Sequence, residues 1–152
     1  MTSRANTGGT TEEVAFDEEL STSTVCPFLF VVLHIDQPAL GGARYNLSNV
    51  DVIEIGRASE RSAARMQEGS TQKLELRLPS PTISKAHARI VRKVDHFFFE
   101  DLGSRNGSFV NGQRVSSAVL KDGDFIEIGR IFLRFRAAMP ASPTTAQDLD
   151  LA

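Results

Sequence analysis

Short β-rich segments, separated every few residues by turn-forming residues, run through most of this chain. Val, Ile, Leu and Phe recur in the segments, and pairs such as Gly41-Gly42, Asn106-Gly107 and Asp122-Gly123 separate them. We expect strands at 28–35, 44–47, 52–55, 73–78, 88–94, 97–101, 108–110, 125–128 and 131–136. Many short strands with frequent turns predict an all-β sandwich of two mainly antiparallel sheets.

The two ends of the chain differ in composition from this middle part. Residues 1–25 are rich in Ser, Thr, Gly and Glu, and residues 139–152 are rich in Pro, Ala, Ser and Thr. Neither stretch has the sustained apolar period needed to offset the entropy of ordering it. We therefore expect two disordered tails around one domain at 26–138, because 152 residues leave no room for a second domain of usual size.

A long connection joins the strands expected at 52–55 and 73–78. Within it, residues 60–68 include Ala63, Ala64 and Met66, which favour a helix. Two alternatives stay open for this stretch, a short helix and a mobile loop.

Charge, cysteine and histidine content argue against several classes of protein. The net charge of −2 gives no broad basic field for a nucleic acid. Cys26 is the only cysteine, and His34, His87 and His96 lack metal-ligand spacing, so we expect no disulfide, metal or cofactor. The longest apolar run, 28–33, is far below the roughly 20 residues that span a membrane. Without an export signal, we expect a cytoplasmic protein that binds neither membrane nor nucleic acid.

Three short motifs combine residues that suit a bound phosphate. They are Gly56-Arg57, then Ser84-Lys85-Ala86-His87, then Asp101-Leu102-Gly103-Ser104-Arg105-Asn106-Gly107, which continues to Asn111-Gly112. All of them fall at the ends of expected strands. A phosphorylated residue brings close to two negative charges and three acceptor oxygens, so its site needs charge-assisted donors that are held in place.

The first two motifs supply different kinds of donor. The guanidinium of Arg57 can bind phosphate oxygens as a fork, the hydroxyl of Ser84 can donate to them, and Lys85 adds a mobile positive charge. We expect Gly56 to allow a backbone turn that would be costly for other residues. We expect His87 to be buried and to fix the loop that carries Ser84, because an imidazole with an ordinary pKa near 6.5 is a poor permanent cation.

Together and in this order, the motifs resemble those of the forkhead-associated (FHA) domain, a phosphothreonine-binding β-sandwich. The segment Leu120-Lys121-Asp122-Gly123-Asp124 extends the match, and the resemblance covers about 28–136. The residues it implies for phosphopeptide binding are Arg57, Ser84, Lys85, Arg105 and Asn106. By this resemblance, Asn106 bonds the peptide backbone next to the phosphothreonine, and Arg105 lies beside the phosphate or the residues after it.

A second set of residues is expected to support the site. These are Gly56, His87, Asp101, Gly107 and Asn111. We expect Asp101 to bond loop backbone and Leu102 to fill the core. The pairs Asn106-Gly107 and Asn111-Gly112 are expected to make tight turns.

Two departures and one internal repeat bear on the resemblance. Lys85 stands where the family often has arginine, and 59–71 looks like a small insertion beside the binding face. The sequence Ile-Glu-Ile-Gly-Arg at 53–57 recurs at 126–130, which offers Arg130 as a second candidate anchor. We predict that Arg57 binds the phosphate and that Arg130 does not.

The resemblance implies a phosphothreonine-dependent protein-binding module of bacterial Ser/Thr kinase signalling, either an adaptor or the regulatory domain of a larger regulator. Its partners would be a phosphothreonine-containing protein or peptide and a Ser/Thr protein kinase. A tethered tail phosphorylated at Thr10 or Thr11 could also bind, at about millimolar effective concentration.

Two other functions compete with this interpretation. One is a phospho-independent scaffold or dimerisation module of the same fold. The other is a hydrolase with Ser84, His87 and Asp101 as a triad, which is disfavoured because no nucleophile elbow or oxyanion hole can be identified. We therefore expect a protein that is not an enzyme.

Overall fold

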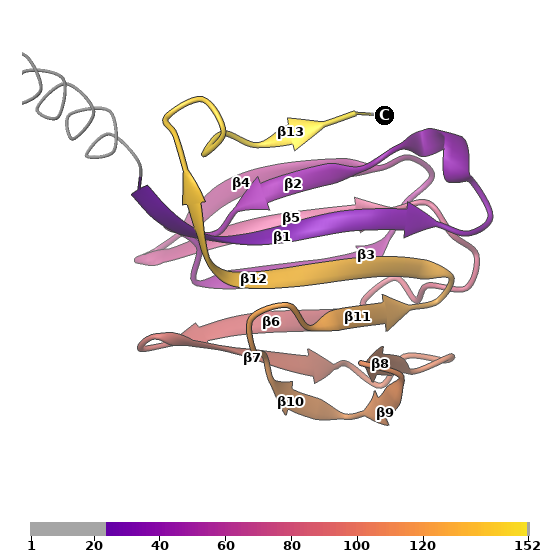
Figure 1. Cartoon of the computed structure of the whole chain (residues 1–152). Coiled ribbons are helices and arrows are strands. Elements are labelled where there is room, and N and C mark those ends of the chain that lie inside the picture. The colour runs from indigo at the N-terminus through magenta and orange to yellow at the C-terminus, as the bar shows by residue number, and fades with distance from the viewer. Residues whose placement is uncertain (1–23, 152) are drawn as a thin grey trace, which may run out of the picture.

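The computed structural model describes residues 24–151, which form a sandwich of two β-sheets (Figure 1). Sheet A contains, in spatial order, β13 (Leu149–Asp150), β2 (Ala43–Asn46), β1 (Thr24–His34), β12 (Ile131–Ala141), β11 (Phe125–Ile128), β8 (Ser108–Val110) and β9 (Gln113–Val115). Sheet B contains β10 (Ser117–Val119), β7 (His96–Asp101), β6 (Ala88–Lys93), β3 (Val52–Arg57), β5 (Thr71–Leu78) and β4 (Ser62–Glu68). One short 3-10 helix, η1 (Pro38–Leu40), follows β1.

This architecture confirms the predicted all-β sandwich of mainly antiparallel sheets. Among the described strands, β3 and β5 are the only parallel pair. Every strand expected from the sequence is present, and β4, β9, β10 and β13 are additional.

The core forms because apolar residues alternate along the strands and turn one face of each sheet inward. In β7, Phe97 and Phe99 are buried and Phe98 between them is half-buried, as the alternation predicts. The ring of Phe97 in sheet B packs against Phe135 in sheet A, with 5.2 Å between ring centroids. Each apolar side chain buried in this way contributes about 1.5–3 kcal/mol of stability, so the pair helps to hold the sheets together.

Strand β4 replaces the helix or mobile loop expected at 60–68. It pairs antiparallel with β5 along its whole length, and Gly69, with φ of 60°, lies in the short turn between them. Both alternatives were wrong because pairing with a long neighbouring strand outweighs the weak helix preference of alanine and methionine. Most of β4 is exposed, so its sequence carries no apolar pattern of either period.

The C-terminal segment also differs from the disordered tail expected at 139–152. Strand β12 continues to Ala141, and the chain then returns as β13 beside β2. Together with the half-buried Met139 and Ala146, it covers a small apolar cluster that includes the fully buried Phe28. The domain therefore extends beyond 138, because this polar segment binds partners far away in the sequence.

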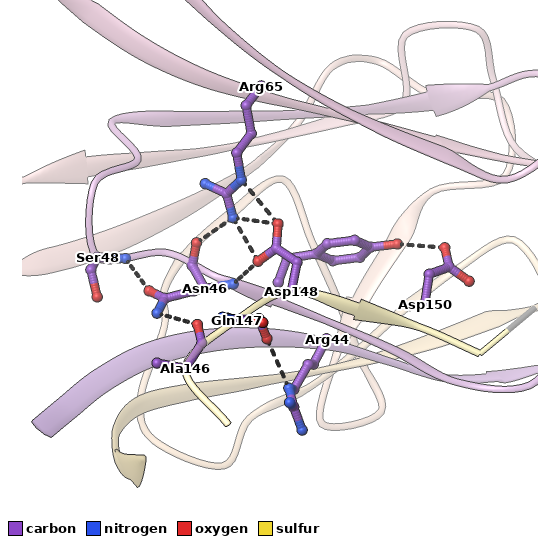
Figure 2. A network of polar contacts seen from close by, with 9 residues as sticks. Arg44, Asn46, Ser48, Arg65, Ala146, Gln147, Asp148 and Asp150 are labelled. Carbon is purple, nitrogen blue, oxygen red and sulfur yellow. Dashed lines mark hydrogen bonds and ion pairs between the residues drawn. The ribbon is translucent and has the colours of Figure 1, made fainter. Parts of the chain in front are cut away.

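Polar side chains tie the C-terminal segment to both sheets (Figure 2). Asp148 accepts hydrogen bonds from Nε of Arg65 on β4 at 2.9 Å and from the backbone N–H of Asn46 on β2 at 2.8 Å. The side chain of Asn46 donates to the carbonyl of Ala146 at 2.7 Å. Asp150 accepts from the hydroxyl of Tyr45 at 3.2 Å. The segment thus adds β13 to sheet A beside β2 and connects it to β4, the edge strand of sheet B.

Residues 1–23 and 152 lie outside the described residues. Most of the tail expected at 1–25 falls there, and so do Thr10 and Thr11.

Candidate functional site

Two loops and the end of β3 meet at one end of the sandwich, and hydrogen bonds hold them to one another. The end of β3 contacts the loop between β5 and β6, since Arg57 donates from its backbone N–H to Ser84 and from Nη1 to the carbonyl of Ile83, both at 3.1 Å. The loop between β7 and β8 contacts the same loop through Nδ2 of Asn106, which donates to the carbonyl of Thr82 at 2.9 Å. The loops therefore form one fixed surface.

A cavity of about 320 Å³ opens between these loops. The residues that line it are Arg57, Pro81, Thr82, Ile83, Ser84, Lys85, Arg105 and Asn106. The structure thus brings together all five side chains that the sequence analysis assigned to phosphopeptide binding. Three of the lining residues are cations and none is a carboxylate, so the cavity suits an anion.

The hydroxyl of Ser84 is oriented by its neighbours. Its oxygen accepts a hydrogen bond from the backbone N–H of Arg105 at 3.0 Å. Because a serine hydroxyl has one proton to donate, that proton stays available for an acceptor in the cavity.

His87 fixes this loop from below the surface. The imidazole is fully buried, its Nδ1 accepts from the backbone N–H of Ser84 at 3.1 Å, and its Nε2 lies 2.9 Å from the carbonyl of Gly107. With Nδ1 acting as the acceptor, Nε2 carries the proton and donates to Gly107. Burial lowers the pKa of His87, which keeps the ring neutral and preserves both bonds.

Asp101 organises the loop between β7 and β8. Its carboxylate accepts from the backbone N–H groups of Gly103 and Ser104 and from the hydroxyls of Ser104 and Ser108, at 2.6 to 3.0 Å. Burial raises the pKa of Asp101, but the bonds from Ser104 and Ser108 together lower it further, so the net shift is downward. The carboxylate is therefore ionised and holds the loop that carries Arg105.

Leu102 was wrongly expected in the core. It is 40% exposed, because the alternation that buries Phe97 and Phe99 places Asp101 toward the inside and the next residue outside.

The explanation given for Gly56 was also wrong. It lies inside β3, outside the positive-φ region, so it makes no turn. A Cβ at this position would lie 1.9 Å from the carbonyl oxygen of Lys85 and 2.5 Å from Nη1 of Arg77. Glycine is needed here because the loop after β5 approaches the β3 backbone closely.

The remaining support residues are Gly107, in the loop before β8, and Asn111, in the turn between β8 and β9. Gly107, with φ of 81°, supplies the carbonyl that binds His87. Asn111 and Gly112 have φ of 51° and 83° in the turn between β8 and β9, which fits the type I′ hairpin that an Asn-Gly pair favours. Nδ2 of Asn111 donates to Asp124 at 2.9 Å, so this residue ties its hairpin to the segment before β11 and does not line the cavity.

The second arginine of the internal repeat is placed differently from the first. In both copies the isoleucines are buried, but Arg130 follows β11 in sheet A and does not line the cavity. Its Nε donates to Asp36 at 2.7 Å, in an exposed ion pair. Sequence reasoning missed Arg77, whose guanidinium lies over Gly56, because no motif contains it.

Comparison with known proteins identifies the family to which this fold and site belong. A family model described as FHA domain matches residues 53–129, which hold all three motifs. The chain therefore belongs to the FHA domain family.

Individual relatives agree with that assignment. The glycogen accumulation regulator GarA of Mycobacterium tuberculosis is 28% identical over 145 residues, which cover 86% of this chain and 87% of that protein. The oxoglutarate dehydrogenase inhibitor of Corynebacterium jeikeium is 41% identical over 58 residues, which cover 38% of this chain and 40% of that protein. The FHA domain of CT664 from Chlamydia trachomatis has the same fold, with a TM-score of 0.52 and 22% identity over 72% of this chain and 96% of that one.

Two features are absent from residues 24–151. No group of three or more His, Cys, Asp or Glu side chains in this range could hold a metal ion. No helix in the same range is long and apolar enough to cross a membrane.

Proposed function

We propose that this chain is a phosphothreonine-dependent protein-binding module of Ser/Thr kinase signalling. The observation that carries the proposal is the convergence of five side chains, from the end of β3 and from two loops, onto one cavity that no carboxylate lines. They are Arg57, Ser84, Lys85, Arg105 and Asn106. A phosphate dianion needs several charge-assisted donors that are positioned before it binds, and this cavity offers them.

Each side chain has its own role in the proposal. Arg57 is the phosphate anchor, because its guanidinium is exposed at the cavity and offers a planar fork of donors. The oriented hydroxyl of Ser84 donates to a second phosphate oxygen, and Lys85 adds charge. Asn106 bonds the peptide backbone beside the phosphothreonine, with Arg105 next to it.

The relatives favour a regulatory role exerted by binding another protein. GarA is named as a regulator of glycogen accumulation, and the Corynebacterium relative is named as an inhibitor of oxoglutarate dehydrogenase. By analogy, the partner of this chain is a protein phosphorylated on threonine by a Ser/Thr kinase, in the cytoplasm.

The proposed module is non-catalytic, and the geometry around Ser84 supports this. Nδ1 of His87 accepts from the backbone N–H of Ser84 and so is not bonded to the hydroxyl that a nucleophile would use. On the other side of the ring, Nε2 lies 3.9 Å from Oδ1 of Asp101 and donates to a backbone carbonyl instead. A general base needs hydrogen-bond reach to its nucleophile, so this arrangement favours a structural histidine.

A phosphopeptide library tests the proposal. The full chain is screened against degenerate peptides with a central phosphothreonine, and the best peptide is then measured with and without its phosphate. We expect binding only with the phosphate. Equal affinity for both forms would instead identify the phospho-independent scaffold of the same fold. Turnover of a generic ester would support the competing hydrolase function.

A further inference from the structure

A second cavity, of about 590 Å³, lies next to the first. The residues that line it are Arg57, Ala58, Ser59, Arg77, Lys85 and Ala86. The two cavities share Arg57 and Lys85, so a peptide bound at the first has one flank beside the second. Arg105 and Asn106 line the first cavity alone, and Arg77 lines the second alone.

Arg77 is held in this position by contacts on two sides. Its Nη1 donates to the carbonyl of Lys85 at 3.1 Å, and its Nε donates to Glu75 at 3.2 Å. The missing side chain at Gly56 makes room for the guanidinium, since a Cβ there would lie 2.5 Å from Nη1. A guanidinium has five N–H donors, so these two bonds leave others for a ligand in the cavity.

The second cavity has the lining of an anion site and enough room for an acidic side chain. Three cations line it and no lining residue is a carboxylate, although Glu75 orients Arg77 from outside. The small side chains of Ala58 and Ala86 leave the cavity open, and the exposed Ser59 adds a hydroxyl. Because Arg77 is pre-positioned, an acidic group would gain a charge-assisted bond with little further loss of side-chain entropy.

We propose that Arg77, Lys85 and Ser59 form a second anion subsite, which selects phosphothreonine peptides that carry a further acidic group on the flank away from Asn106. That group is a carboxylate of Asp or Glu or the phosphate of a second phosphorylated residue. This inference rests on the proposed function, because it concerns the same bound peptide.

The test compares affinities within one set of peptides. A phosphothreonine peptide with alanine flanks is the reference, and aspartate or phosphoserine is placed at each neighbouring position in turn on both sides. We expect one flank to show an acidic position that raises affinity about tenfold over the reference, the size of one charge-assisted hydrogen bond. Gain with aspartate points to an acidic protein sequence, and larger gain with phosphoserine points to a doubly phosphorylated partner.

Variants assign that gain to the subsite. Arg77→Met should reduce the ratio of acidic to reference affinity to nearly one, and Arg89→Met is the matched control. Arg89 is also an outward-facing arginine of sheet B paired with a glutamate, Glu100, but it lines neither cavity. Ser59→Glu changes an exposed loop residue and should remove the same gain by placing a carboxylate in the cavity, so the test stands even if Arg77→Met folds poorly.

Two outcomes overturn the inference, and they differ in what they say about the proposed function. If the reference peptide binds but no acidic position adds affinity, or the gain survives Arg77→Met and Ser59→Glu, the subsite is wrong and the proposed function stands. If no phosphothreonine peptide binds at all, both are wrong.

Discussion

Arg57 ends strand β3 and Arg61 lies just before strand β4, yet the surroundings of these two nearby arginines are opposite. Arg57 is exposed at the cavity, and its guanidinium donates to one backbone carbonyl. The side chain of Arg61 is 1% exposed, and it donates to the carboxylate of Asp150, to Nε2 of His34 and to the backbone carbonyls of 40–42. One arginine faces solvent, and the other is enclosed by acceptors.

The difference separates an arginine that stabilises the fold from one that is free to bind a ligand. Taking a guanidinium out of water is costly unless carboxylate and carbonyl oxygens replace the water, and Arg61 has both. Its partner Asp150 comes from β13, so the C-terminal segment neutralises this buried charge. No carboxylate lines the cavity at Arg57, so its charge remains available.

The largest expected effect is a loss of stability when the buried Arg61 is removed. Arg61→Ala should lower the free energy of unfolding by about 3 kcal/mol, the lower end for breaking a buried pair, because the Asp150 side chain is 37% exposed. Arg65→Ala is the control, because its pair with Asp148 is 41% exposed on the arginine side and should cost about 1 kcal/mol or less. Urea denaturation measures both, and equal losses would contradict the distinction.

The next effect belongs to the binding side. Arg57→Ala should weaken phosphothreonine-peptide binding roughly ten- to a hundredfold, because a charge-assisted bond is worth about 1.5–3 kcal/mol. Its urea midpoint should stay close to that of the parent chain. Arg130→Ala is the matched control from the internal repeat, already paired with Asp36, and should change little. Fluorescence anisotropy with one labelled peptide compares them, and similar losses from both variants would reject Arg57 as the anchor.

Acid should lower the free energy of unfolding, because the regions around Arg57 and Arg61 each contain one buried histidine, His87 and His34 respectively. Burial lowers the pKa of His87, and burial together with Arg61 lowers the pKa of His34, from an ordinary value of 6.5. The unfolded chain therefore binds protons first, so this stability is fully present above pH 6.5 and is lost as pH falls toward the depressed values. The slope should not exceed about 1.4 kcal/mol per pH unit for each histidine.

An NMR titration of the imidazole C–H signals separates the two histidines. Protonation of Nδ1 in His87 would remove the acceptor for the Ser84 N–H, so phosphopeptide affinity should fall over the same range. A titration midpoint above 6.5 for either ring would show that the sign of its shift is wrong.

The smallest effect concerns the binding side alone. Phosphothreonine should bind several-fold more tightly than phosphoserine in matched peptides, since one buried methyl is worth about 0.8 kcal/mol. Pro81 and Thr82 line the cavity and offer carbon atoms for that contact. Titration of the two peptides by calorimetry gives the ratio, and equal affinities would mean that the cavity holds no methyl contact.

Local patterns predicted the strands and the loops of the candidate site. Alternation in 97–99 fixed which rings enter the core, and the Asn-Gly pair at 111–112 predicted its hairpin turn. Such patterns can be read from sequence because strand alternation and positive φ depend on neighbouring residues. The same information did not predict β4, whose exposed residues carry no pattern and whose partner is a whole strand.

The sequence by itself thus determined an all-β sandwich with the residues of an FHA-type site at its strand ends. Only the tertiary structure showed that the missing side chain at Gly56 leaves room for the Arg77 guanidinium and the Lys85 carbonyl. It also showed that the C-terminal segment belongs to the domain. The tertiary structure alone also distinguished the buried Arg61 from the exposed Arg57, which the sequence gives no means to tell apart. The physical reason is that a buried charge is defined by its acceptors, and the acceptors of Arg61 come from 40–42 and from Asp150, far away along the chain.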